Sequence, residues 1–125
     1  ALLSGTDRRD LIARSEAVLS ADDVRALRGA VSEVHASEAL IAYVQTLMAR
    51  SRHHPGVRVG LSPRAGLAVL RAARAHALLL GRAHALPEDV QTLFIAVAAH
   101  RLVADADGGD GTAMAKSILH AVMVD

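Results

Sequence analysis

Val57-Arg58-Val59-Gly60-Leu61-Ser62-Pro63-Arg64-Ala65 is the stretch that marks the beginning of the central helix of this chain. Ser62 is a residue type that caps the free N–H groups of a helix, and proline suits the first helical position. Arg64 then lies in the first turn, where the helix dipole already carries partial positive charge. Such a turn predicts a place for an anion, with a phosphate oxygen as the obvious ligand. The alternative is an ordinary helix start with a solvated arginine.

Hydrophobic spacing predicts an all-α fold, a helical bundle of four main helices followed by a short C-terminal helix. The four are expected at about residues 20–34, 38–52, 63–80 and 87–101. A capping box at residues 20–23 opens the first, and Gly81 ends the third. A glycine-rich loop, residues 105–111, precedes the last helix, for which Thr112 is the expected cap. Two short extended pieces, residues 57–59 and 83–86, could pair as a minimal two-stranded element.

The predicted helices carry apolar residues at helical spacing. These candidate core residues are Val24, Leu27, Val31, Val34, Leu40, Val44, Leu47, Met48, Val90, Leu93, Phe94, Val97, Ile118, Leu119 and Val122. Apolar residues make up 52% of the chain, with a single tyrosine and a single phenylalanine. Such a core needs helices that approach one another closely. A length of 125 residues predicts one domain.

Composition also bears on the compartment. No cysteine is present, so disulfides and thiolate chemistry are excluded, and the cytoplasm is the default expectation. The longest uncharged stretch before the tail, residues 39–49, is shorter than the roughly 20 residues that span a bilayer. No secretory signal peptide is recognisable at residues 1–10.

Charge is unevenly placed, although the formal net charge is only +1. Between Ala39 and Pro87 there are seven arginines and no acidic residue. Arg64, Arg71 and Arg82 would share one stripe if the helix continued to Arg82. With Arg74, we expect this basic stripe to meet nucleotide phosphates or an adjoining subunit, and a solvated basic face is the alternative.

Six short motifs follow one another along the chain. They are Val34-His35-Ala36-Ser37-Glu38-Ala39-Leu40-Ile41-Ala42-Tyr43-Val44, Arg52-His53-His54-Pro55-Gly56-Val57, Ser62-Pro63-Arg64-Ala65, Leu70-Arg71-Ala72-Ala73-Arg74-Ala75, Gly81-Arg82 and Pro87-Glu88-Asp89-Val90. In this order and spacing, over residues 20–102, the chain resembles the C-terminal lid domain of MoxR-type AAA+ ATPases. It departs from the family pattern at His84, where an aromatic residue is common, and at Leu86, where threonine is common. The proline that is frequent early in the fourth helix is replaced by Ile95-Ala96.

The resemblance implies a division of the chain and a set of ligands. Residues 1–19 would connect to a preceding nucleotide-binding domain, residues 20–103 would form the lid, and residues 104–125 would form the glycine-rich loop and the short C-terminal helix. Arg64 matches the sensor-2 arginine that reaches the γ-phosphate of ATP. Ser62, Pro63 and Tyr43 are further candidates for nucleotide contact.

The resemblance also implies partners, and a mechanism in a longer parent protein. The lid would close over ATP and Mg²⁺ held by its own large domain, beside neighbouring subunits of a hexamer. The parent would hydrolyse ATP and act in chaperone-like assembly or activation of other proteins, commonly with partners that carry von Willebrand factor A domains.

The chain by itself has no ATP-hydrolysing motif. No Gly-x-x-x-x-Gly-Lys-[Ser/Thr] phosphate loop occurs, and the only lysine is Lys116. No strand ends in paired acids that could hold magnesium, and the pairs Asp22-Asp23 and Glu88-Asp89 stand at helix starts, as caps do. We therefore expect no enzyme activity and no cofactor of this fragment alone.

Two other classes of function remain as alternatives. A small basic-faced helical domain could bind nucleic acid or another protein, but no helix-turn-helix spacing is convincing and no aromatics interleave with the basic residues. A metal or acid–base site would have to use the seven histidines. These are scattered and lack paired acids at ligand spacing, so no metal site is expected.

Overall fold

The computed structural model describes residues 5–106 and 109–122. Its α-helices are α1 (Arg8–Arg14), α2 (Ala21–Glu33), α3 (Glu38–His53), α4 (Pro63–Leu79), α5 (Pro87–Ala98) and α6 (Gly111–Ala121). A short 3-10 helix η1 (Ala99–Arg101) and two short strands, β1 (Val57–Val59) and β2 (Val103–Ala104), complete the described elements. The predicted all-α fold is confirmed. Residues 107–108 of the expected glycine-rich loop lie outside the described residues, as do residues 1–4 and 123–125.

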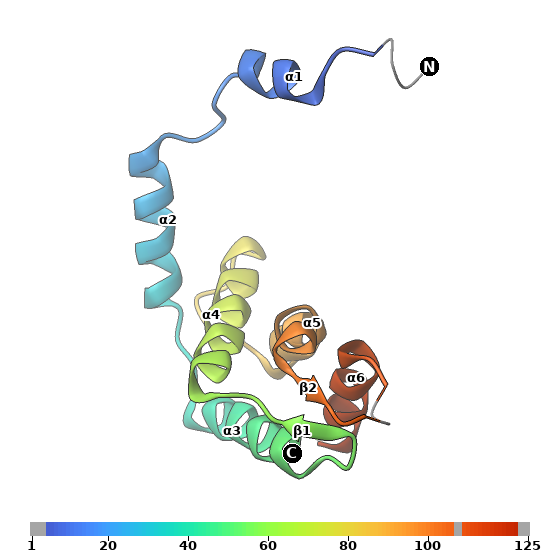
Figure 1. The fold of residues 1–125 in the computed structure, drawn as a ribbon. Coiled ribbons are helices and arrows are strands. Elements are labelled where there is room, and N and C mark those ends of the chain that lie inside the picture. The colour runs from blue at the N-terminus through green and yellow to red at the C-terminus, as the bar shows by residue number, and fades with distance from the viewer. Residues whose placement is uncertain (1–4, 107–108, 123–125) are drawn as a thin grey trace.

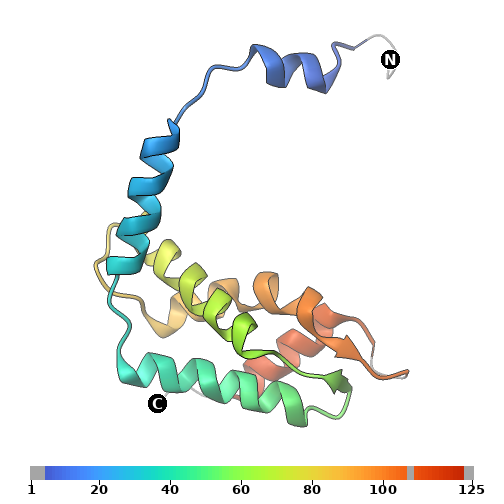
Figure 2. The same cartoon turned by 60° about the vertical axis from the view of Figure 1, so that its left-hand side comes forward.

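The first two helices form an arm that leaves the bundle (Figure 1). Helix α2 begins with the predicted capping box, in which Ser20 Oγ accepts from Asp23 N at 3.0 Å and Asp23 Oδ2 accepts from Ser20 N at 2.8 Å. The prediction that Val24 and Leu27 belong to the core is wrong, because α2 leaves the bundle and these side chains are 38% and 46% exposed. Helix α1 was not expected from the sequence. It lies beyond α2 and away from the bundle in both views (Figures 1 and 2).

Helix α4 is the centre of the bundle and contacts α2, α3 and α5. Its buried face is built of small residues, which are Ala65, Gly66, Val69, Ala73 and Ala77. A Cβ added to Gly66 would collide with the sulfur of Met48 on α3. The absence of side-chain bulk therefore lets α3 and α4 approach closely, as the composition predicted.

Helix α6 docks on the bundle and closes the core. Met114, Ala115 and Ile118 are buried, and the helix contacts α3, α5 and η1. Its cap is Asp110, whose Oδ1 accepts from Ala113 N at 2.8 Å. The prediction that Thr112 caps α6 is wrong. The carboxylate of Asp110 satisfies the first turn two residues earlier, so Thr112 is already inside the helix.

The two-stranded element exists, but its predicted pairing is wrong. Strand β1 pairs antiparallel with β2, with Val57 opposite Ala104 and Val59 opposite Val103. Residues 83–86 instead lie beside the connection from α2 to α3, where Ala85 N donates to His35 O and His35 N donates to Ala83 O, each at 2.9 Å. The reason is the length of α4. Its 17 residues span about 25 Å, and the chain turns at Gly81 directly after the helix, so residues 83–86 stay near the far end of α4 and away from β1.

Helix α5 starts without a side-chain cap on Leu86, as expected for leucine at this position. Asp89 compensates by accepting from Leu86 N through Oδ2 at 2.7 Å, which is one half of a capping box. Among the described residues, no helix is long and apolar enough to cross a membrane.

Candidate functional site

The start of α4 has the geometry predicted from Ser62-Pro63-Arg64. Ser62 Oγ accepts from Ala65 N at 3.2 Å, and Pro63 occupies the beginning of the helix. Gly66 N is bound by Ser62 O, also at 3.2 Å. Within the described part of the chain, the N–H of Arg64 has no acceptor, and its exposed guanidinium has no ion pair. This turn therefore offers two unused kinds of donor, the amide and the guanidinium of one residue, to an anion.

Ser51 holds this helix start against α3. Its hydroxyl donates to Met48 O at 2.6 Å and accepts from Leu61 N at 2.8 Å, in a fully buried position. Leu61 is itself buried in the core. The residue directly before Ser62 is thus fixed by both a hydrogen bond and packing. Sequence reasoning missed Ser51, because a serine in the last turn of a helix carries no local signal of such a distant partner.

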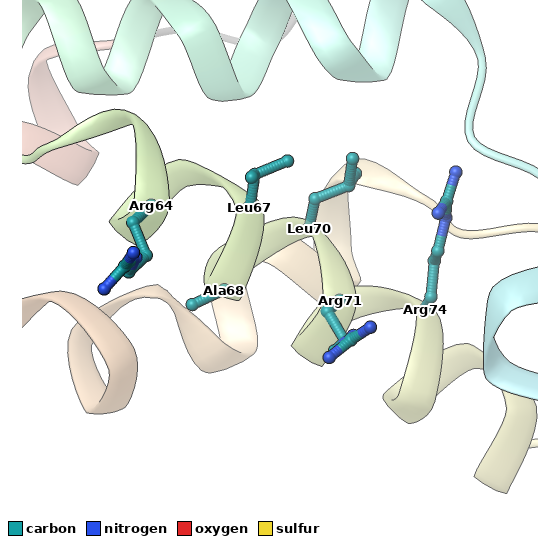
Figure 3. Close-up of a pocket in the computed structure, with 6 residues that line it drawn as sticks. All are labelled: Arg64, Leu67, Ala68, Leu70, Arg71 and Arg74. Atoms are coloured by element: carbon teal, nitrogen blue, oxygen red, sulfur yellow. The ribbon is translucent and has the colours of Figure 1, made fainter. Parts of the chain in front are cut away.

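A shallow hollow of about 410 Å³ lies along α4, starting at Arg64. Its other lining residues are Leu67, Ala68, Leu70, Arg71 and Arg74. Figure 3 shows Arg64 and Arg71 pointing to the same side of α4, with Arg74 extending to the opposite side. Arg64 and Arg71 are seven residues apart, which is about two helical turns. Arg64 and Arg71 therefore line the hollow from one side, and Arg74 lines it from the other side.

A second hollow, of about 490 Å³, lies between α2 and α4. Arg28 and Val31 of α2 line it with Arg71 and Ala75 of α4. Arg71 belongs to both hollows, so the two adjoin. Arg28 was not among the predicted site residues, since it lies far from the others in sequence and in a region that also contains acids.

Arg82 does not belong to the basic stripe, and this part of the prediction is wrong. Helix α4 ends at Leu79, and Gly81 has a φ of 75°, a conformation that favours glycine and turns the chain away. Arg82 Nη1 donates to Asp89 Oδ2 at 2.8 Å, and Nη2 donates to Asp89 Oδ1 at 2.6 Å. Its positive charge is neutralised within the domain.

Asp89 is the centre of a polar cluster between α4 and α5. Its side chain is only 1% exposed, and His76 Nδ1 lies 2.6 Å from Oδ1. The hydrogen bonds from Arg82 lower the pKa of Asp89 well below its usual range, and those from Leu86 N and His76 add to this against the opposing effect of burial. His76 thus has an acidic partner that lies 13 residues away along the chain, which the sequence pattern did not predict. No group of three or more metal-ligand side chains occurs in the described ranges.

Tyr43 does not belong to the exposed surface along α4. It is buried on α3, and it is not among the residues that line the hollow beside Arg64. Its hydroxyl is buried and has no hydrogen-bond partner among the described residues. A buried hydroxyl without a hydrogen-bond partner is uncommon in folded proteins.

The helical bundle with its short β1–β2 pair fits a lid domain of the AAA+ class. A model of the AAA lid domain family matches residues 49–120. Since this is more than half of the chain, the chain belongs to the AAA lid domain family. The resemblance to an AAA+ lid is confirmed.

Two relatives extend this finding. The chain is 32% identical over 127 residues to the uncharacterized protein YeaC of Bacillus subtilis (strain 168). This alignment covers 98% of this chain and 40% of YeaC. It is also similar to a crystal structure of a candidate ATPase from Cytophaga hutchinsonii ATCC 33406. That match has a TM-score of 0.77 and 26% identity, and it covers 83% of this chain and 36% of the other. The chain therefore spans about two fifths of the length of these relatives.

Proposed function

We propose that this chain is the nucleotide-sensing lid of a MoxR-type AAA+ ATPase and that Arg64 is its sensor-2 arginine. The observation that carries the proposal is the open first turn of α4, where the guanidinium and the amide of Arg64 both lack partners among the described residues. In an AAA lid domain, such a turn suits the γ-phosphate of ATP bound on a preceding large domain. Ser62 and Pro63 shape the turn, and ATP and Mg²⁺ are held by the parent protein.

The proposed mechanism is a movement driven by charge. ATP on the large domain attracts Arg64, and the lid rotates onto the nucleotide. Hydrolysis and loss of phosphate weaken this charge-assisted hydrogen bond, so the lid reopens. Because Ser51 fixes the residue before Ser62 to α3, movement of Arg64 is transmitted to the body of the bundle.

The arm supports the proposed division of the chain. We assign residues 1–19 to a connector from the large domain, residues 20–103 to the lid and residues 104–125 to its C-terminal loop and helix. Leu11, Ile12, Val18 and Leu19 are all at least half exposed. Apolar residues exposed in such a series fit contact with a further part of the protein.

The wider proposal concerns the assembly. The lid would contact its own large domain and the neighbouring subunits of a cytoplasmic hexamer, with Arg71 and Arg74 available for nucleotide or subunit contact. Hydrolysis would drive chaperone-like assembly or activation of partner proteins, including proteins with von Willebrand factor A domains.

The test is the ATP turnover of the parent protein that carries Arg64→Ala. We expect turnover to fall about 10- to 100-fold, which corresponds to the loss of one hydrogen bond to a charged group. The melting temperature should change little, because the Arg64 side chain is exposed. Arg58→Ala, at an exposed position of β1, is the matched control and should retain turnover. Unchanged turnover in Arg64→Ala would refute the sensor assignment.

A further inference from the structure

We propose that the surface formed by Arg28, Arg71 and Arg74, with the apolar residues between them, docks an acidic segment of a partner protein. We call this surface the arginine face. The inference deepens the part of the proposed function that assigns Arg71 and Arg74 to a contact surface. It does not depend on Arg64 as a nucleotide sensor.

The arginine face is continuous across two helices. Arg71 lines both the hollow along α4 and the hollow between α2 and α4, and Arg28 closes the second hollow from the α2 side. The C-terminal end of α2 comes close to α4 in both views (Figures 1 and 2), and the two helices are in contact. The base of the arm and the central helix therefore present one surface.

This surface carries positive charge without a counter-ion from the domain itself. Neither hollow has an acidic lining residue. In the described ranges, the ion-paired carboxylates are Asp22, which binds Arg25, and Asp89, which binds Arg82 and His76. Neither acid lines a hollow. Arginines gathered in this way repel one another and attract an anionic partner.

Arg74 adds an independent indication. Its Nε is buried and has no hydrogen-bond acceptor among the described residues, while its side chain lines the hollow along α4. A partly desolvated guanidinium is less well solvated than an exposed one, so a carboxylate placed beside it is bound more strongly. Arg74 is thus a cation that gains from an acceptor supplied from outside the domain.

The apolar part of the surface favours a protein segment over nucleic acid. Leu67 is 68% exposed within the hollow, and Leu70 lines it too. A leucine makes no favourable contact with a phosphate backbone, whereas it can pack against an apolar side chain of a bound protein segment. Single-stranded nucleic acid would need exposed aromatics for stacking, but Tyr43 and Phe94 are both buried. Arginine also pairs bidentately with carboxylates. We infer a segment that alternates acidic and apolar side chains.

The test uses this 125-residue chain and three fluorescently labelled probes of equal net charge. They are a peptide of alternating glutamate and leucine, a peptide of glutamate and glycine, and single-stranded DNA. We expect the glutamate–leucine peptide to bind most tightly. Arg28→Gln and Arg71→Gln should each raise its Kd about fivefold, the loss of one exposed charge-assisted contact. Arg58→Gln, which removes an exposed arginine outside both hollows, is the matched control and should leave the Kd unchanged.

Two results would overturn the proposal. Equal weakening by all three substitutions would show attraction by net charge alone. Tighter binding of DNA, lost in Arg28→Gln and Arg71→Gln, would show a nucleic-acid surface instead. Arg28 and Arg71 are exposed, so both variants should fold, which circular dichroism checks. The measurement contains no nucleotide, and Arg28→Gln should leave the basal ATP turnover of the parent unchanged. A failure here is therefore distinct from a failure of Arg64 as sensor.

Discussion

Arg82 and Asp89 form a bidentate ion pair that ties the turn after α4 to the first turn of α5. The two guanidinium nitrogens lie 2.8 Å and 2.6 Å from the two carboxylate oxygens. Leu86 N and His76 Nδ1 lie within hydrogen-bond distance of the same carboxylate. Asp89 is buried, so its charge is satisfied by protein donors, and the geometry of the α4–α5 connection depends on it.

Asp89→Asn should destabilise the domain by about 3 kcal/mol, because the substitution leaves the charge of Arg82 unpaired. It also places the amide N–H₂, which is a donor, against the donors of Arg82 and Leu86. The free energy of unfolding in urea measures this. Glu88→Gln is the matched control, since Glu88 is the exposed neighbour in the same turn. Its effect should stay within about 0.5 kcal/mol. Equal stability of the two variants would show that the buried ion pair contributes nothing.

The same substitution should change the pH dependence of stability. The pKa of Asp89 is lowered in the folded protein, chiefly by hydrogen bonds from Arg82, so its stabilisation is fully present above the unfolded pKa of about 3.9. It is lost as the pH falls through the lower folded value. The difference in unfolding free energy between the wild type and Asp89→Asn should thus shrink below about pH 4. Urea unfolding at pH 5, 4 and 3 measures this, and a difference that grows with acid would contradict the assignment.

Ser51→Ala should destabilise the helix start that carries Arg64. The substitution leaves Leu61 N without its acceptor in a buried position, at a cost of about 1–3 kcal/mol. Amide exchange at Leu61 should accelerate, and in the parent protein ATP turnover should fall because Arg64 is held less firmly. Ser32→Ala on the exposed face of α2 is the control and should be neutral. Unchanged exchange at Leu61 would show that core packing alone holds this segment.

Gly111 and Gly29 should respond in opposite ways to alanine. A Cβ at Gly111 would collide with the carbonyl oxygen of Ala99, a backbone atom that cannot move aside, so Gly111→Ala should displace α6 and cost about 1–3 kcal/mol. Nothing lies within 4 Å of a Cβ at Gly29 in the middle of α2. Gly29→Ala should favour that helix by up to about 1 kcal/mol. Thermal unfolding measures the first, and amide exchange within α2 measures the second.

Sequence reasoning succeeded where a structure is decided by neighbours along the chain. Ser20 and Ser62 mark helix starts because their hydroxyls accept from the N–H three residues ahead, and Pro63 does so because its fixed φ and missing N–H suit the first helical position. Gly81 marks a helix end for the same reason, since it adopts a positive φ. The helix boundaries at residues 38, 63 and 87 follow from such signals. Membership in the AAA+ lid class followed from the order of these local motifs.

The tertiary structure alone decided which distant residues meet. The partner of β1 depends on the length of α4, which carries residues 83–86 away from the strand and leaves β2 as the neighbour. Arg82 left the basic stripe because the chain turns at Gly81 and brings it to Asp89. Arg28 joined Arg71 only because the C-terminal half of α2 contacts α4. Local sequence sets backbone hydrogen bonds over one helical turn, whereas these contacts are set by helix lengths and by the packing of the whole core.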